Sequence, residues 1–404
     1  MANSKVNISK RAQELPASPI RKLVPLADEA KKKGIKVYHL NIGQPDVPSP
    51  KEFFEAVKTY PKEVLEYGHS KGDLRLLKAV SAYFAKNNIS VEPEEIMITT
   101  GGSEAIIFAM LAVAGPGDEI IVFEPFYTNY NSFAIITGVH LVPLPTKPEE
   151  GYHLPAIEKI EEKISPKTKA IFLCNPNNPT GTVFTKKELE GLANLCKKYN
   201  LFFLSDEVYR EFVYEGEHIS LMHLEGLEEQ AVLLDSFSKR FSLCGARIGC
   251  IVSKNKKIME VALKLGQARL CSPTLEQHGV LAALKSGDTF FAQIREEFKK
   301  RRDVTYAELM KIPGAVCVRP SGAFYIMAKL PVPDIEDFAS WMLTDFSLDG
   351  ETTMIAPGPG FYATSGLGKS EARIAYVLNT SDLKKAMRIL AKGIEVYSVQ
   401  KVKV

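Results

Sequence analysis

Short, almost continuous apolar runs alternate with amphipathic segments of helical period through the middle of the chain. The apolar runs predict strands at residues 96–100, 119–123, 169–174, 201–204, 231–234 and 248–252. Helical patterns follow several of them, at residues 103–114, 127–137 and 186–199, and Thr185 precedes the last one as an N-cap. Apolar strands separated by helices are typical of a mostly parallel sheet that helices cover on both faces. Ligands bind beyond the carboxyl ends of the strands in such sheets.

The pattern changes after the Pro-Gly pair at residues 313–314. Helical periodicity fills residues 256–311 before this point. Beyond it, strand-like runs at 323–328, 354–356 and 372–377 mix with helical patterns at 335–346 and 382–397, which indicates a smaller α+β unit. The first fifty residues are rich in Pro and Gly, and we expect them to pack on this unit. We therefore predict a large domain over residues 50–290 and a small domain built from residues 1–49 and 291–404.

The composition is ordinary for a globular protein and narrows the function classes. The 404 residues carry a net charge of +3, and no basic run alternates with aromatic residues, so nucleic-acid binding has little support. No apolar run approaches the length that crosses a membrane, and the N-terminus lacks the apolar stretch of a signal peptide. The six cysteines show no CxxC pair and the seven histidines no ligand spacing. We therefore expect reduced thiols, a cytoplasmic location and no metal.

Residues suited to an anion or a flat ring follow the first two predicted strands. Gly102, Ser103 and Glu104 lie where a strand passes into a helix, and free N–H groups at the start of a helix favour an anion. A simple tight turn is the alternative explanation of the glycines. Tyr127 follows the next strand and is a candidate for stacking on a planar heterocycle. An aromatic residue of the core would give the same pattern.

The next two strand ends carry an amide and a carboxylate. Residues 175–181, NPNNPTG, are a dense cluster of turn formers, and the Asn178 amide can donate to a phenolate oxygen without adding charge. Asp206 follows an apolar strand, where a buried carboxylate is costly unless a cation such as a protonated pyridine nitrogen pairs with it. An ordinary loop and an exposed helix N-cap are the respective alternatives.

The stretch 236–249, SFSKRFSLCGARIG, joins a lysine to an arginine eight positions later. Lys239 lies just past a strand among small residues, where desolvation lowers the pKa of its amine and frees the lone pair to attack a carbonyl. Arg247 offers the permanent charge and paired donors that suit a phosphate. An amine beside a phosphate clamp is what pyridoxal phosphate requires. A solvated Lys-Arg pair on the surface is the alternative.

The order of these motifs, each after a strand, is more informative than any one of them. NPNNPTG, SDEVY and SxSKxxxxxGxRxG together resemble the class I and II aminotransferases of fold type I, the aspartate aminotransferase-like enzymes. The resemblance extends over essentially the whole chain, from Asn41 to Arg373 and the residues after it. It implies an α/β fold with a mostly parallel seven-stranded sheet flanked by helices, plus a smaller α+β domain. It also implies bound pyridoxal 5'-phosphate and an obligate homodimer with shared active sites.

The resemblance assigns roles to the residues found above. Lys239 would hold the cofactor as a Schiff base and then serve as the general base at the substrate Cα. Asp206 would pair with the pyridine nitrogen, Asn178 and Tyr209 would hydrogen-bond to the phenolic oxygen, and Tyr127 would stack on the ring. The phosphate would be held by Gly102, Ser103, Glu104, Ser236 and Arg247, and Tyr67 would reach the phosphate bound in the partner subunit.

The resemblance also implies a substrate pocket and a reaction. Arg373 would bind the α-carboxylate, with Gly43 and Asn178 lining the same pocket; a structural ion pair and a turn are the alternatives for Arg373 and Gly43. The reaction would be ping-pong transamination of an L-amino acid, aspartate favoured, with 2-oxoglutarate as the expected acceptor.

The choice of substrate is left open by the sequence. Ser103 stands where one branch of bacterial aspartate aminotransferases has a lysine that meets the distal carboxylate. Arg269 is a candidate for that carboxylate, and a surface arginine at a helix end is the alternative. Alanine, aromatic and kynurenine-type substrates remain open, as do a C–S β-lyase on the same scaffold and a ligand sensor without enzymatic activity.

Overall fold

The structure is a computed structural model and describes residues 7–402, with the side chains described up to residue 399. The strands are β1 Lys36–His39, β2 Ile96–Thr99, β3 Glu119–Glu124, β4 His140–Pro145, β5 Thr168–Cys174, β6 Phe202–Asp206, β7 Ala231–Ser236, β8 Gly249–Val252, β9 Val316–Cys317, β10 Tyr325–Lys329, β11 Glu351–Met354, β12 Ala356–Pro357 and β13 Glu371–Ala375. The α-helices are α1 Lys10–Glu14, α2 Val24–Lys32, α3 Lys51–Lys58, α4 Leu74–Lys86, α5 Gly101–Val113, α6 Asn129–Thr137, α7 Ile157–Glu161, α8 Lys186–Tyr199, α9 Lys256–Arg269, α10 Thr274–Ala283, α11 Gly287–Leu309, α12 Ile335–Thr344 and α13 Thr380–Val402.

The larger sheet has seven strands in the order β2-β8-β7-β6-β5-β3-β4. Its neighbouring strands pair in parallel, except that β8 is antiparallel to both β7 and β2. The predicted, mostly parallel sheet is therefore confirmed. The sequence pattern did not predict β4, which contains Pro143 and Pro145. Proline lacks a backbone N–H donor and is tolerated in edge strands, and β4 is such an edge strand.

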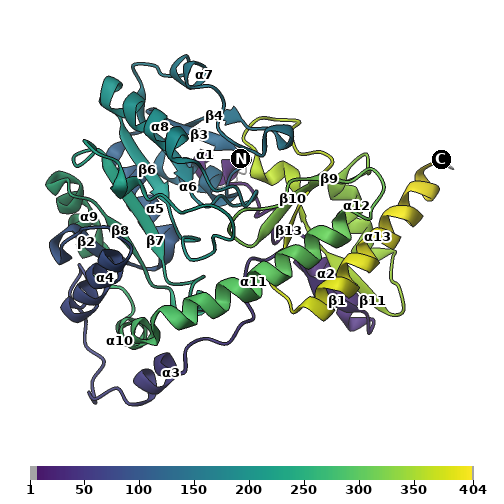
Figure 1. The fold of residues 1–404 in the computed structure, drawn as a ribbon, viewed down its shortest axis with the longest axis horizontal. Helices are drawn as coiled ribbons and strands as arrows, with labels where there is room; N and C mark the ends of the chain where they lie inside the picture. Colours follow the sequence, from purple (N-terminus) through teal and green to yellow (C-terminus); the bar gives the residue numbers. More distant parts are fainter. Residues whose placement is uncertain (1–6, 403–404) are drawn as a thin grey trace, which may run out of the picture.

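Helices pack on both faces of this sheet (Figure 1). Successive residues of β5 point to opposite sides, so that Ile171 joins one apolar cluster and Phe172 the other. The first cluster includes residues of α4 and α8, and the second includes residues of α5 and α9. Full burial of each large apolar side chain contributes roughly 1.5–3 kcal/mol, which makes the sheet a rigid base for the loops at its edge.

A second group of strands lies beside the large sheet. It consists of an antiparallel sheet, β12-β13-β10-β9, and a parallel pair, β1-β11. The pairing of β1 with β11 ties the first fifty residues to the C-terminal part of the chain. Helix α11 runs from the region of α10 toward this second group (Figure 1). The two-domain division at residues 49/50 and 290/291 stays a prediction.

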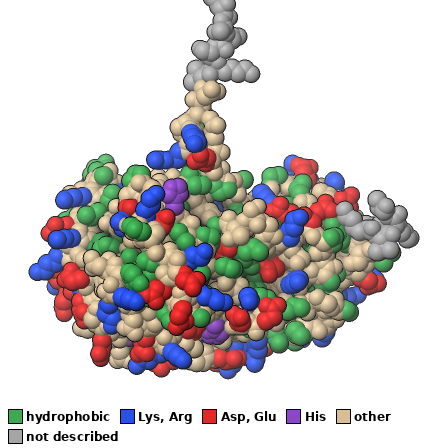
Figure 2. Space-filling view, turned by 90° about the horizontal axis from the view of Figure 1, so that it is seen from above, with side chains coloured by type: hydrophobic (Ala, Val, Ile, Leu, Met, Phe, Trp, Pro, Cys, Tyr) green, Lys and Arg blue, Asp and Glu red, His purple; other side chains and the backbone are tan. Residues whose placement is uncertain are grey.

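Charged side chains of both signs are interspersed over the surface seen in Figure 2. The described N-terminal segment projects from the body of the protein at the top of that view, and none of the residues of α1 is buried. Within residues 7–402, no helix has the length and apolar character needed to cross a membrane.

Candidate active site

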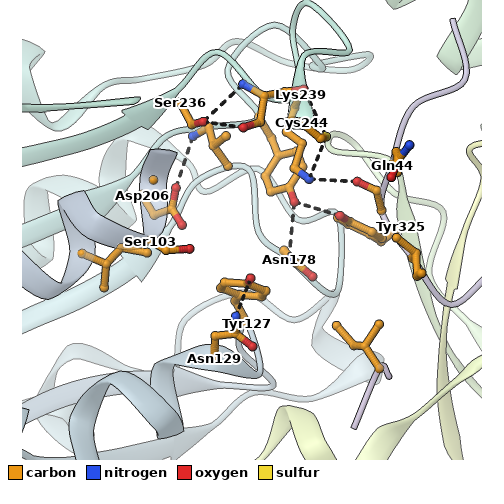
Figure 3. A pocket seen from close by; sticks show the side chains of 18 of the residues that line it. Gln44, Ser103, Tyr127, Asn129, Asn178, Asp206, Ser236, Lys239, Cys244 and Tyr325 are labelled. Atoms are coloured by element: carbon orange, nitrogen blue, oxygen red, sulfur yellow. Dashed lines mark hydrogen bonds between the residues drawn. The ribbon is translucent and has the colours of Figure 1, made fainter. Parts of the chain in front are cut away.

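A cavity of about 630 Å³ lies at the carboxyl ends of the central strands. Residues following β2, β3, β5, β6 and β7 contribute to it, as the rule for such sheets predicts. Figure 3 shows Lys239, Asp206, Asn178 and Tyr127 around a common space. The predicted site residues that line this cavity are Gly43, Gly102, Ser103, Tyr127, Asn178, Asp206, Tyr209, Ser236, Lys239, Arg247 and Arg373. The chain thus brings together residues that are as many as 330 positions apart in the sequence.

Lys239 is the only lysine among the lining residues, and its amine points into the cavity (Figure 3). Its Nζ donates a hydrogen bond to the backbone carbonyl of Gly43 at 2.9 Å and lies 3.7 Å from the Sγ of Cys244. Burial is the main cause that lowers the pKa of the amine; Cys244 opposes it, and the positive charges of Arg373 and Arg247 lower the pKa further. The arrangement favours the neutral, nucleophilic form of the amine.

Asp206 is the last residue of β6, and its carboxylate is buried. One oxygen accepts a hydrogen bond from the Tyr130 hydroxyl at 3.0 Å, and the other lies 3.4 Å from the N–H of Val208. Burial raises the pKa of Asp206 to about 7, although these two hydrogen bonds act in the opposite direction. No described lysine, arginine or histidine forms an ion pair with this carboxylate. A buried carboxylate in this state is suited to a cationic ligand.

Arg373 lies in β13 and is 1% exposed. Its Nη1 donates to Oδ1 of Asn178 at 3.0 Å and its Nη2 to the backbone carbonyl of Asn41 at 2.6 Å. The guanidinium packs 4.3 Å from the centre of the Tyr325 ring, and its Nε has no hydrogen-bond partner in the described structure. No described carboxylate pairs with it. The arginine therefore offers an uncompensated, buried positive charge to a carboxylate ligand.

Three polar groups extend this arrangement toward Lys239. The Asn178 amide donates to the Tyr209 hydroxyl at 3.4 Å, and the hydroxyls of Tyr209 and Tyr325 are 2.8 Å apart. All three side chains are buried. All three line the cavity, where their donors can meet an oxygen atom of a ligand.

The start of α5 forms the opposite end of the cavity. Gly102 and Ser103 belong to its first turn, whose N–H groups have no partner inside the helix. Gly101 has a φ of +75°, and a Cβ at this position would collide with the guanidinium of Arg247. Ser236, at the end of β7, lines the same end. Free N–H groups at a helix start, a guanidinium and a hydroxyl make this end suitable for a phosphate.

The Tyr127 ring lies across the space from Lys239 (Figure 3). Its hydroxyl accepts a hydrogen bond from the amide of Asn129 at 2.9 Å, which fixes the direction of the ring. Burial raises the pKa of the hydroxyl, so that it stays protonated at neutral pH. The aromatic face is therefore presented to the cavity in a fixed orientation.

Three predicted residues lie outside the lining. Arg269 Nε is 3.3 Å from a carboxylate oxygen of Glu104, and Arg269 Nη1 donates to the Ser272 hydroxyl at 2.8 Å. The other Glu104 oxygen accepts from the N–H of Thr100 at 2.8 Å, so Glu104 supports the turn before α5. Tyr67 is 81% exposed. Within a single chain, Arg269, Glu104 and Tyr67 are thus not joined to the cavity.

Several residues in or beside the cavity were not predicted from the sequence. Tyr130, in α6, does not line the cavity but donates to the Asp206 carboxylate, and Tyr127 lies just before that helix. Tyr325 lines the cavity and Asn41 lies beside it; contacts with segments far along the chain bring both to the site, so neither has a local signal. Cys244 lies in the stretch 236–249 but received no role from the sequence.

A network of buried charges lies directly behind the site. Asp235 precedes Ser236, and Arg240 follows Lys239; their side chains form a buried ion pair. Arg210 pairs with Glu207 at 3.0 Å and lies 3.6 Å from Asp235. Asp235 and Ser236 are neighbours in β7, and neighbouring residues of a strand point to opposite faces. The same backbone segment therefore carries the charge network on one side and the cavity on the other. The network fixes the loops that carry the lysine and the aspartate.

Known proteins resemble the chain over nearly its whole length. A family profile described as "Aminotransferase class I and II" matches residues 35–392. The aspartate aminotransferase of Sulfurisphaera tokodaii is 33% identical over 90% of this chain and 92% of its own length. The aromatic-amino-acid aminotransferase 2 of Thermococcus litoralis is 31% identical over 95% of this chain and 97% of its own. A solved structure of Thermus thermophilus aspartate aminotransferase with maleate superposes with a TM-score of 0.88 at 29% identity, over 96% of this chain and 100% of that one.

Proposed function

Because the chain belongs to the class I and II aminotransferases and has their aspartate aminotransferase-like fold, we propose that its cavity binds pyridoxal 5'-phosphate and an amino acid substrate. The cofactor, when bound, forms a covalent bond to an amine and draws electrons from the substrate Cα. The donor we propose is an L-amino acid, aspartate favoured, and the acceptor is a 2-oxo acid such as 2-oxoglutarate.

One observation above all supports the cofactor. A lysine with a lowered pKa and a buried aspartate without a cationic partner line the same cavity. The amine of Lys239 suits the aldehyde of the cofactor, and Asp206 suits its ring nitrogen, which is cationic when protonated. Neither side chain has an equivalent partner within the described part of the chain.

The remaining lining residues fit the other groups of the cofactor. Gly102, Ser103, Ser236 and Arg247 are assigned to the phosphate, because they combine free N–H groups, hydroxyls and a guanidinium at one end of the cavity. The hydrogen-bonded pair of Asn178 and Tyr209 is assigned to the phenolic oxygen. Tyr127 is assigned to the face of the ring, and Glu104 supports the phosphate turn from outside the lining.

Residues of the chain bind the substrate, remove its proton and exclude water. Arg373 binds the α-carboxylate with two parallel donors and turns the Cα–H bond toward Lys239. The neutral Nζ of Lys239 removes the proton from Cα, and the Gly43 carbonyl holds the amine in position. The buried Tyr209 and Tyr325 close one wall and keep bulk water from the reacting atoms.

We also propose a homodimer in which each subunit completes the site of the other. Exposed apolar side chains are concentrated in one stretch of the chain, at Phe54, Val64, Leu65, Tyr67 and Leu74. A concentration of this kind indicates a surface that a second protein covers. Tyr67 is proposed to reach the phosphate bound in the partner subunit. All six cysteines are free thiols, which supports the proposed cytoplasmic location.

Lysine labelling and an amino acid screen test the proposal. The purified protein should absorb visible light through its cofactor, and borohydride should attach the cofactor to Lys239. Lys239→Ala should leave a folded protein without transaminase activity, whereas the exposed Lys257→Ala should behave as wild type. Each amino acid is then mixed with the enzyme, and loss of the visible band identifies donors.

Labelling of another lysine would overturn the assignment of Lys239. If pyruvate and a thiol are released from cystathionine without an added 2-oxo acid, the protein is a lyase rather than a transaminase. A screen in which only aromatic amino acids react would retain the transaminase and refute the preference for aspartate.

A further inference from the structure

The cavity holds more positive charge than the proposed roles account for. Its acidic and basic lining residues are one carboxylate, Asp206, the Lys239 amine and three permanent cations, Arg21, Arg247 and Arg373. Lys239 is assigned to the reacting carbons, Arg247 to the phosphate and Arg373 to the α-carboxylate. Arg21 is left without a role, although it lines the same cavity.

The chain holds Arg21 in a defined relation to the proposed α-carboxylate site. The backbone carbonyl of Ile20 accepts a hydrogen bond from the Asn41 amide at 2.9 Å, and the Asn41 carbonyl accepts from Arg373 at 2.6 Å. Asn41 is fully buried, so it ties Arg373 to the backbone immediately before Arg21. The N–H of Arg21 donates to the carbonyl of Ser18 at 3.0 Å, which fixes the turn that carries it.

Two other cations that could bind a side-chain carboxylate, Lys22 and Arg269, form ion pairs with carboxylates of the chain, whereas Arg21 does not. The next residue, Lys22, forms an ion pair with Glu336, and both line a second cavity instead. Arg269, the sequence-based candidate for a side-chain carboxylate, pairs with Glu104. No described carboxylate pairs with Arg21, which is exposed at the mouth of the cavity. Its charge also acts to lower the pKa of the Tyr127 hydroxyl, against the larger effect of burial, which is consistent with a guanidinium on the cavity side.

We propose that Arg21 binds the side-chain carboxylate of a dicarboxylic amino acid or 2-oxo acid while Arg373 binds the α-carboxylate. This inference rests on the function proposed above and specifies its substrate class. Two arginines of one cavity, Arg373 bonded to Asn41 and Arg21 next to the Ile20 carbonyl that Asn41 holds, match two carboxylates on one molecule. A guanidinium gives paired donors to a carboxylate, and a substrate without that carboxylate leaves these donors unused. Arg21 is thus a determinant of specificity and takes no part in the reaction at Cα.

Substitution of Arg21 in the holoenzyme tests the proposal. Arg21→Ala should lower kcat/KM for aspartate, glutamate and 2-oxoglutarate by about 10- to 100-fold, the range expected for hydrogen bonds to a charged group. The value for alanine should change by less than about twofold. Arg21→Lys should recover part of the loss, because it restores the charge without the paired donors. Lys22→Ala is the matched control, since it removes the adjacent cation and should alter none of these values.

Binding of unreactive acids gives a second measurement that does not depend on turnover. Calorimetry should show that Arg21→Ala lowers the affinity for succinate by a similar factor and leaves the affinity for butyrate unchanged. An equal loss for aspartate and alanine, or an equal selective loss in Lys22→Ala, would refute the role of Arg21. A wild-type enzyme that reacts with alanine but with no dicarboxylic acid also refutes it and leaves the transaminase intact. A wild-type enzyme that reacts with no amino acid refutes the proposed function itself.

Discussion

Replacement of Asp206 by asparagine should stabilise the cofactor-free protein and weaken the cofactor-bound one. In the cofactor-free protein the carboxylate is buried, accepts hydrogen bonds from Tyr130 and Val208, and has no cationic partner among the described residues. The neutral amide of asparagine fills nearly the same volume and avoids the burial of a charge. With the cofactor bound, the same substitution removes the charge that we assign to its ring nitrogen.

The size of the effect follows from the pKa of Asp206. Burial raises it from an ordinary value of 3.8 to about 7, so the folded state holds a proton between these pH values that the unfolded state has released. The stability that the protonated carboxyl provides is complete below about pH 3.8 and is lost as the pH rises to about 7. One pKa unit corresponds to about 1.4 kcal/mol, so the loss at pH 8 reaches about 4 kcal/mol as an upper value.

Denaturant unfolding of the cofactor-free wild type and Asp206→Asn at several pH values measures this directly, at one fixed protein concentration. The two should be similar at pH 4.5, and Asp206→Asn should become the more stable as the pH rises to 8. Added pyridoxal phosphate should raise the wild-type midpoint more than that of the variant. Asp235→Asn is a useful contrast, because Asp235 pairs with Arg240 and its loss should destabilise at each pH. A stability difference that does not vary with pH would refute the reasoning.

Two further predictions concern the ends of the cavity. Arg373→Lys should lower kcat/KM by about 100-fold for alanine and aspartate alike, because both carry the α-carboxylate; a loss confined to dicarboxylic substrates would contradict its assignment. Gly101→Ala should weaken cofactor binding by about tenfold or more in a titration of the visible band, since its φ of +75° and the adjacent Arg247 leave no room for a methyl group. Gly102→Ala, where the nearest atom is at an ordinary 3.5 Å, should lose less, and equal losses would refute the steric argument.

The sequence predicted those parts of the fold and site that depend on residues close together in the chain. Apolar runs and helix caps are set by neighbouring residues, so the central strands and α8, with Thr185 as its N-cap, agree with the structure. Asp206, Asn178 and Lys239 follow apolar strands directly, and the carboxyl ends of these strands meet at one edge of the sheet. Strand β4 was not predicted because proline has a low strand propensity. Its two prolines are tolerated because β4 lies at the edge of the sheet.

The residues that the sequence left open or did not identify depend on distant contacts. Arg269 and Arg21 both look like surface arginines beside a helix, and nothing near either one shows which has a carboxylate partner. In the fold, Glu104 pairs with Arg269, whereas Arg21 lines the cavity next to Ile20, whose carbonyl Asn41 holds. Tyr325 likewise comes from β10. Its hydroxyl lies next to that of Tyr209 because the second group of strands packs beside the large sheet, which no local pattern indicates.

The distribution of charge supports the proposal that this cavity is a binding site rather than a gap in the packing. Behind it, Asp235, Arg240, Arg210 and Glu207 neutralise one another, as buried charges in a stable core must. Inside it, Asp206 and the three arginines form no ion pair with a described residue, and burial shifts the pKa of both Asp206 and Lys239 toward their neutral forms. Unpaired charged groups lower the stability of the folded protein, and the large sheet provides enough stability to offset this cost. A ligand that pairs with these groups recovers that free energy on binding. We therefore expect the acids bound here to carry a carboxylate at each end.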